Sequence, residues 1–136
     1  MVGNEFAVAV FFHPKISSLN DETHVRAAQS LASALGAAMP AWYALTLILS
    51  LALAFILRGN SPAGTLALIA SALFVVSIIF TVLLLVPINN KIVKWDLDSL
   101  PGEWQQLRQR WDRLHVFRVV ILFVAFILLV LAALTN

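Results

Sequence analysis

The chain has 136 residues, of which 61% are hydrophobic and 12% charged, with no cysteine and a formal net charge of +2. Soluble domains are typically about 45–50% apolar and about 25% charged, so the composition excludes an ordinary soluble domain and a disordered chain. The lack of cysteine excludes a disulfide framework and a thiolate metal site. The small net charge does not favour a nucleic-acid partner, and the length allows one domain. These properties predict a single all-α membrane domain over residues 1–136.

Two segments are clear membrane spans. Ala63–Val86 contains 24 residues without a charge, which at ~1.5 Å per residue extends about 36 Å and exceeds the ~30 Å hydrocarbon core. Val119–Leu134 is a run of sixteen apolar residues, and it becomes long enough if Arg118 snorkels to the interface. We therefore predict spans at about 63–86 and 117–134.

A third span is predicted at about 41–57. Trp42 and Tyr43 at its start are typical interfacial anchors, and the polar segment Arg58–Pro62 after it predicts a tight turn.

The N-terminal segment is short for a span. Phe6–Phe12 supplies only seven apolar residues, between Glu5 and the pair His13-Pro14, and a helix over residues 1–13 would reach only about 20 Å. The segment lacks the basic region and cleavage site of a signal peptide. Two interpretations remain: a short first helix, or a chain whose true start lies upstream. We favour the short helix, because it completes a bundle of four transmembrane helices.

Helical connections are predicted on both sides of the second and third spans. Residues 21–38 have helical apolar spacing, with Gly36 and Pro40 as the expected stop. This amphipathic helix would lie on the cytoplasmic interface or pack under the bundle. Residues 101–116 are predicted to be a cytoplasmic extension of the last helix, which then continues to residue 134.

The charges are divided unequally between the two sides of the membrane. Four crossings place eight of the nine Lys and Arg residues on the side of residues 13–40 and 87–118, and leave Arg58 alone on the other. The positive-inside rule therefore predicts that both long loops are cytoplasmic. The expected location is a bacterial cytoplasmic membrane, with membrane lipid and a hydrophobic small molecule as the partners.

The most informative pattern lies at the start of the last helix. Aromatic and cationic residues recur there at i, i+4, i+7, i+11 and i+14, which places them on one helical face. They are Trp104, Arg108, Trp111, His115 and Arg118. One interpretation is an interfacial belt, with tryptophans among headgroups and arginines on phosphates. The other is a polar pocket closed by the elbow at Asn89 and Asn90, which follows Pro87.

Three ionisable groups outside the cationic set are candidates for chemistry. Glu5 lies in or at the mouth of the first span, where a carboxylate is costly unless it is functional or reaches water. His13 and His115 both fall at the cytoplasmic boundary, so we expect that the fold can bring them together. No HxxH or HExxH spacing supports a metal site, and neither a metal nor another cofactor is predicted.

The chain resembles the anthrone oxygenase-like family of small four-helix membrane proteins, most of them bacterial. The resemblance rests on the following residues: Phe12-His13-Pro14, Pro87-Ile88-Asn89-Asn90, Trp104, Arg108, Trp111 and Arg118. It implies an oxygenation related to the conversion of anthrones to anthraquinones, without a conventional cofactor. The chain departs from the family in its shorter first helix and in Leu114-His115, where the family often has asparagine.

These observations predict an oxygenase-like enzyme that acts on a hydrophobic aromatic substrate. The predicted catalytic residues are His13 and His115, either of which would take a proton next to a carbonyl. The predicted substrate-binding residues are Asn89, Asn90, Trp104, Arg108, Trp111 and Arg118. The alternative is a non-catalytic membrane module whose basic face binds lipid or a partner protein.

Overall fold

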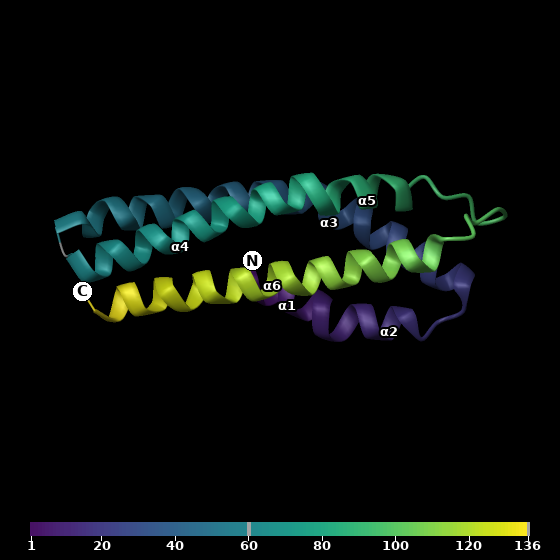
Figure 1. The fold of residues 1–136 in the computed structure, drawn as a ribbon, viewed down its shortest axis with the longest axis horizontal. Helices are drawn as coiled ribbons and strands as arrows, with labels where there is room; N and C mark the ends of the chain where they lie inside the picture. Colours follow the sequence, from purple (N-terminus) through teal and green to yellow (C-terminus); the bar gives the residue numbers. More distant parts are fainter. Residues whose placement is uncertain (60, 136) are drawn as a thin grey trace.

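The computed structural model describes residues 1–59 and 61–135, and within these ranges the chain forms helices joined by short connections. Three long helices run beside one another, and a shorter N-terminal helical segment lies against the last of them (Figure 1). In chain order the elements are α1 (Val2–Ala7), η1 (Val8–Phe12), α2 (His13–Ser17), α3 (Asp21–Ile56), η2 (Leu57–Gly59), α4 (Ser61–Phe80), η3 (Thr81–Leu85), α5 (Val86–Ile92) and α6 (Trp104–Leu134). The predicted all-α bundle is confirmed.

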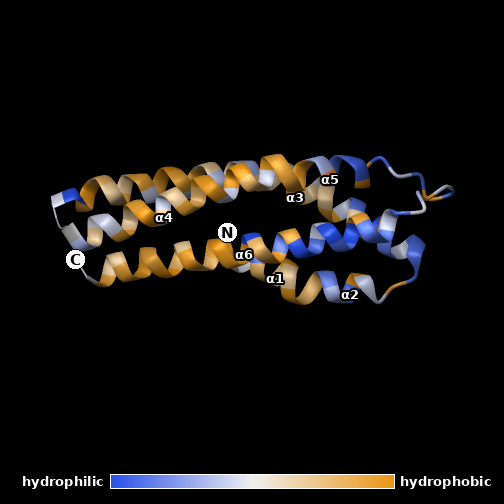
Figure 2. Ribbon diagram, viewed as in Figure 1, coloured by the Kyte–Doolittle hydropathy of each residue, from blue (hydrophilic) through white to orange (hydrophobic). Residues whose placement is uncertain are grey.

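Three helical runs are long and apolar enough to cross a membrane, namely Asp21–Gly59, Pro62–Ile92 and Trp104–Leu134. Figure 2 shows that the bundle is hydrophobic along most of its length and hydrophilic at the end that contains α2, the end of α5 and the start of α6. We call this the polar end. Many large apolar side chains are exposed on the outer faces of these helices, where hydrocarbon rather than water would surround them. The protein is therefore a membrane protein.

The N-terminal segment is shorter than the other three helices. Its helical run Val2–Ser17 extends only about 24 Å at ~1.5 Å per residue. In Figure 1 it begins beside the middle of α6 and runs toward the polar end. The segment therefore places its first turns, including Glu5, half-way along the bundle.

The second helix differs from the sequence expectation. Gly36 and Pro40 were expected to end an amphipathic helix before a separate span, but α3 continues through Pro40 as one helix of 36 residues. A proline inside a helix removes one hydrogen bond and crowds the carbonyl four residues earlier. That residue is Gly36, and neighbouring helices commonly support such prolines in membranes.

Two other prolines are accommodated by π-helical turns. The π-helical segment Val8–Phe12 ends two residues before Pro14, and the π-helical segment Thr81–Leu85 ends two residues before Pro87. A π-turn widens the helix and moves the carbonyls that a proline ring would otherwise strike. Both helices therefore continue past their prolines, where the sequence suggested a stop or a bend.

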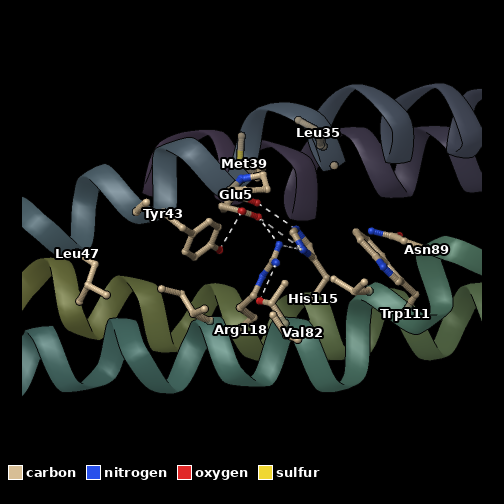
Figure 3. Close-up of a pocket in the computed structure, with 16 residues that line it drawn as sticks. Glu5, Leu35, Met39, Tyr43, Leu47, Val82, Asn89, Trp111, His115 and Arg118 are labelled. Carbon is tan, nitrogen blue, oxygen red and sulfur yellow. Dashed lines mark hydrogen bonds and ion pairs between the residues drawn. The ribbon is translucent and has the colours of Figure 1, made fainter.

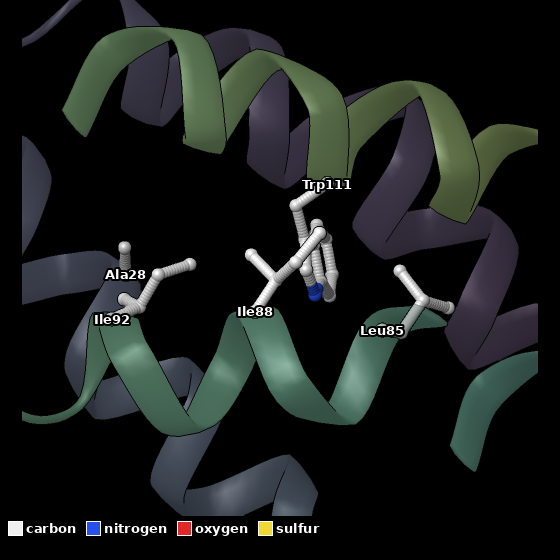
Figure 4. Close-up of a cluster of buried hydrophobic side chains, with 5 residues drawn as sticks. All are labelled: Ala28, Leu85, Ile88, Ile92 and Trp111. Atoms are coloured by element: carbon white, nitrogen blue, oxygen red, sulfur yellow. The ribbon is translucent and has the colours of Figure 1, made fainter. Parts of the chain in front are cut away.

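Small residues set the spacing of α4 and α6 through the apolar part of the bundle. The fully buried positions between them are largely alanines, which permit close approach of helices in membranes. These alanines are Ala63, Ala67, Ala70, Ala125 and Ala132. Near the polar end the packing changes to large side chains, where Trp111 of α6 joins a cluster with Leu85, Ile88 and Ile92 (Figure 4).

The turn between α3 and α4 makes a stability prediction. A Cβ atom at Gly64 would lie 2.7 Å from the backbone oxygen of Leu57, so the turn has no room for a side chain. We expect Gly64→Ala to lower the unfolding free energy by about 1–3 kcal/mol through this clash.

The matched control is Gly36→Ala, since no atom lies within 4 Å of a Cβ at Gly36. This change should leave stability unchanged or raise it by about 0.5–1 kcal/mol. Thermal unfolding in detergent measures both effects, and equal stability of the two variants would contradict the packing described for Gly64.

Candidate functional site

A carboxylate buried inside the bundle forms the centre of the site. Glu5 of α1 is 2% exposed. Its Oε2 accepts a hydrogen bond from Arg118 Nη2 at 2.6 Å, and its Oε1 accepts one from the Tyr43 hydroxyl at 3.0 Å. A buried charge is tolerated only when it is paired and hydrogen-bonded. These contacts therefore join α1, α3 and α6 at one point.

His115 lies beside this ion pair and is held at both ring nitrogens. Its Nε2 is 3.3 Å from the backbone oxygen of Glu5, and its Nδ1 is 2.9 Å from Arg118 Nη2. A carbonyl oxygen only accepts and a guanidinium only donates, so Nε2 carries the hydrogen and Nδ1 accepts. His115 is therefore a neutral imidazole whose Nδ1 lone pair accepts the hydrogen bond from Arg118.

Arg118 also binds a residue of η3, the fourth helical element that contributes to the site. Its Nη1 donates to the hydroxyl of Thr81 at 3.1 Å, and Thr81 in turn donates to the backbone oxygen of Ser77 at 2.7 Å. Thr81 is the first residue of the π-helical segment η3. Widened turns of this kind are frequent at functional sites. Here the turn provides Thr81, a hydrogen-bond partner of the Arg118 guanidinium.

A cavity of about 390 Å³ opens beside this cluster. Figure 3 shows the polar side chains of the cluster between the apolar ones that complete the wall. The cavity is lined by Glu5, Leu35, Gly36, Met39, Pro40, Tyr43, Ala44, Leu47, Ile78, Thr81, Val82, Val86, Asn89, Trp111, His115 and Arg118. Its volume lies within the range of small-molecule sites, about 300–1,000 Å³.

The exposed part of the cavity lining lies on α3 and on the η3–α5 segment. The lining residues on these two walls include the exposed positions Gly36, Pro40 and Ala44 on one side and Val82 and Val86 on the other. All five are apolar, and they lie in helices that cross the membrane. The mouth of the cavity therefore faces hydrocarbon.

A second polar cluster lies nearer the polar end. His13 Nδ1 and Arg108 Nη2 lie 3.1 Å and 3.0 Å from the same carboxylate oxygen of Asp112. The His13 ring is 5.0 Å from that of His115 and 4.7 Å from that of Trp111 between centroids. The expected approach of His13 and His115 is therefore present, with Trp111 stacked on His115 at 4.8 Å.

His13 lies outside the three membrane-length helices. Burial, together with the positive charges of Arg108 and Arg118, lowers the pKa of His13 to about 3. The side chain is therefore neutral at physiological pH.

The residues proposed from the sequence divide into two groups. Four of them line the cavity, namely Asn89, Trp111, His115 and Arg118. The others do not line it. Asn90 is exposed, while Trp104 is buried against His24 and Trp95 toward the polar end. Arg108 pairs with Asp112 and stacks over Trp111 at 4.7 Å. His13 lies against Trp111 and His115, two residues of the cavity wall, without lining the cavity itself.

Sequence reasoning missed the partners that complete the site. Glu5 was considered as a candidate, but its pairing with Arg118 was not foreseen. Tyr43 was interpreted as an interfacial anchor, and Thr81 and Asp112 were not among the predicted site residues. The only available signal was a carboxylate within an apolar segment, which by default indicates function. Among the residues that the structure describes, no group of three His, Cys, Asp or Glu residues could hold a metal ion.

Comparison with known families gives a match that covers most of the chain. The model of a family described as anthrone oxygenase matches residues 30–128. The matched range contains Tyr43, Thr81, Asn89, His115 and Arg118, so it covers most of the cavity wall. Searches of curated proteins and of solved structures find no match.

The buried ion pair makes a prediction about stability. Arg118→Met should lower the unfolding free energy by about 3–5 kcal/mol, because it leaves the Glu5 carboxylate buried without its charge partner. The double variant Glu5→Leu/Arg118→Met removes both charges together. Its loss of unfolding free energy should be smaller, by at least about 2 kcal/mol, than the sum of the losses of the two single variants. Unfolding titrations in mixed detergent micelles measure these differences.

Arg26→Met is the control, because its partner Glu22 is also exposed and the two form a surface pair at 2.9 Å. Such a change should cost no more than about 0.5 kcal/mol. Additive losses at Glu5 and Arg118 would show that the two charges do not stabilise each other.

The lowered pKa of His13 predicts acid sensitivity. In the unfolded chain this histidine binds a proton near its ordinary value of 6.5, whereas in the folded protein it does so only near 3. Between these values the unfolded state binds the extra proton, so stability falls as the pH falls. Melting temperatures from pH 7.5 to 5 should show this decline, and His13→Asn should make it shallower. An unchanged slope in His13→Asn would contradict the neutral, buried state of the ring.

Proposed function

The chain belongs to the anthrone oxygenase family, and we propose that it is a membrane-embedded, cofactor-independent oxygenase-like enzyme that acts on a hydrophobic aromatic substrate. The observation that carries this proposal is a cavity wall that combines aromatic surface, an ion pair and a neutral histidine whose Nδ1 accepts a hydrogen bond from Arg118. We further propose that the polar end faces the cytoplasm of a bacterial cell, in accordance with its cationic residues.

The walls of the cavity suit a flat apolar molecule. Trp111 and Tyr43 provide aromatic surface, while Leu35, Met39 and Leu47 provide apolar contacts. Because the mouth lies between α3 and η3–α5, a substrate dissolved in the bilayer can enter without crossing water. Polar groups meet the molecule only at the inner wall, as in typical ligand pockets where a few polar groups fix orientation.

The proposed reaction begins with removal of a proton from a carbon next to a carbonyl group. His115 Nδ1 accepts this proton. Its lone pair becomes available when Arg118 Nη2 redirects one of its two hydrogens from Nδ1 to the carbonyl oxygen, where negative charge develops. The other hydrogen of Nη2 stays on Glu5, so the ion pair is kept throughout.

The carbanion then transfers one electron to molecular oxygen, which is the oxidant, and the two radicals combine to form a C–O bond. The resulting peroxide takes up the proton held by His115. Loss of the second hydrogen of the original CH₂ group and cleavage of the O–O bond then leave a C=O group and release water, so that a CH₂ group and O₂ give a C=O group and H₂O. The side chains hold and return the proton, orient the ring and exclude bulk water, while the substrate itself supplies the electrons. Asn89 is the further polar group that can orient the substrate within the cavity.

The lipid-binding alternative has less support. It requires Arg108 and Arg118 to bind lipid phosphates, yet both are buried and each is already paired with a carboxylate. Mass spectrometry of molecules that co-purify with the protein discriminates between the two functions. An aromatic molecule supports the oxygenase, and a stoichiometric anionic phospholipid lost on Arg118→Met supports the alternative.

Turnover of anthrone by two histidine variants tests the proposed function. His115→Gln should lower kcat/KM by about 10²–10⁴, the contribution of general base catalysis. His13→Gln should stay within about threefold, because His13 is equally buried but does not line the cavity. Oxygen uptake and anthraquinone formation are measured in nanodiscs, with empty nanodiscs correcting for spontaneous oxidation. A rate no higher than that of empty nanodiscs, or equal rates in the parent and His115→Gln, would refute the proposal.

A further inference from the structure

The guanidinium of Arg118 is divided among three partners. Nη2 donates to Glu5 Oε2 at 2.6 Å and lies 2.9 Å from His115 Nδ1, while Nη1 donates to the hydroxyl of Thr81 at 3.1 Å. In Figure 3, dashed lines join Arg118 to Glu5 and to His115. Nη2 carries two hydrogens, so both are used on the carboxylate and the histidine, and Thr81 binds the other terminal nitrogen.

This arrangement differs from the one that an arginine and a carboxylate commonly adopt. Such pairs are frequently bidentate, with two parallel N–H···O bonds. Here only Oε2 of Glu5 accepts from Arg118, and Oε1 accepts from the hydroxyl of Tyr43 at 3.0 Å. Nε of Arg118 is buried and has no hydrogen-bond partner among residues 1–59 and 61–135. The guanidinium is therefore held in a single-contact pairing, although its shape permits a double one.

A bidentate pairing would remove Nη2 from His115. The guanidinium is rigid and planar, so a rotation that brings a second nitrogen to Oε1 of Glu5 also moves Nη1 and Nη2. Nη1 would then leave Thr81. Nδ1 of His115 lies only 3.7 Å from Oε2 of Glu5, and two acceptors at this distance need a donor between them. The contact with Thr81 opposes the rotation that would withdraw that donor.

Thr81 is a fixed acceptor. Its hydroxyl donates its single hydrogen to the backbone oxygen of Ser77 at 2.7 Å, so toward Arg118 the oxygen can only accept. Its backbone oxygen accepts from the N–H of Val86, five residues later, which is the bond that defines the π-helical turn. Both its side chain and its backbone are therefore held by η3 and the end of α4.

We propose that Thr81 is a positioning residue for the acid–base group. By holding Nη1 it keeps Arg118 from pairing with both oxygens of Glu5, and so it keeps Nη2 on His115. In turnover the same nitrogen redirects its hydrogen from His115 to the carbonyl oxygen of the substrate. Only this role in turnover rests on the proposed function, because the hydrogen bond at His115 exists without substrate.

Nitrogen NMR of the isotopically labelled protein in nanodiscs tests this hydrogen bond without substrate. The signal of His115 Nδ1 is identified by its loss in His115→Gln. Thr81→Val keeps the size of the side chain and removes the acceptor, so the signal should move toward that of an imidazole nitrogen without a hydrogen bond. Thr81→Ser keeps a hydroxyl at this position, and its signal should stay at the parent position.

Turnover of anthrone gives the second measurement. Thr81→Val should lower kcat by about tenfold to a hundredfold, the equivalent of one hydrogen bond to a charged group. KM should stay within about threefold, because the apolar wall that contacts the substrate is unchanged. Thr81→Ser should recover most of the lost kcat, which a change in packing alone would not explain.

Thr46 provides the matched control. Its hydroxyl donates to the backbone oxygen of Trp42, four residues earlier, at 2.8 Å, as that of Thr81 donates to Ser77. Thr46 does not line the cavity. Thr46→Val therefore removes the same kind of intrahelical bond, and it should change neither the His115 signal nor kcat.

A second variant keeps the test decisive if melting temperatures show that Thr81→Val is unfolded. Tyr43→Phe frees Oε1 of Glu5 for a second nitrogen of Arg118. It should therefore move the His115 signal in the same direction as Thr81→Val, and an unchanged signal would contradict the competition between the two pairings.

The outcomes separate this inference from the proposed function. A His115 signal that moves in Thr81→Val and stays in Thr81→Ser and Thr46→Val supports the positioning role, even if the parent protein does not oxidise anthrone. An unchanged signal in Thr81→Val, or equal shifts in Thr81→Val and Thr81→Ser, overturns it even if turnover is observed. A shifted signal with unchanged kcat would overturn the role in turnover.

Discussion

The ion pair between Glu5 and Arg118 is the interaction on which the rest of the site depends. In an apolar bundle neither charge is tolerable alone, so each specifies the position of the other. The contact fixes the short N-terminal segment against α6, and through Tyr43 and Thr81 it also fixes α3 and η3. The cavity is then the space left beside a polar cluster that cannot rearrange freely. This coupling of charge and packing explains how a bundle with mostly small side chains between its helices retains a defined interior site.

The three long helices and much of the site were predictable from the sequence. Runs without charge identify membrane helices because hydrocarbon excludes charge, and the periodicity of α6 placed Trp111, His115 and Arg118 on one face. The periodicity could not show which residues of this face line the cavity and which lie at the polar end. Trp104 lies fourteen residues before Arg118, which is about 21 Å along the helix, so its neighbours belong to the polar end and not to the cavity.

The remaining features depend on tertiary contacts that local rules do not contain. The partner of Glu5 is 113 residues away along the chain, and no pattern within either segment indicates it. Proline rules predicted a helix end at Pro40, but the helix continues, and the chain also stays helical past Pro14 and Pro87. Widened turns accommodate Pro14 and Pro87 locally, and packing in a bilayer favours unbroken helices.

The separation of Glu5 and Arg118 along the chain also has a consequence for biosynthesis. The carboxylate emerges from the ribosome 113 residues before the guanidinium. Until α6 is present, Glu5 has no charge partner, and a lone carboxylate is costly in hydrocarbon. We therefore expect the N-terminal segment to stay at the water interface while α3 and α4 insert, and to dock only once α6 is present. The order in which the bundle assembles would then differ from the order of its helices in the chain.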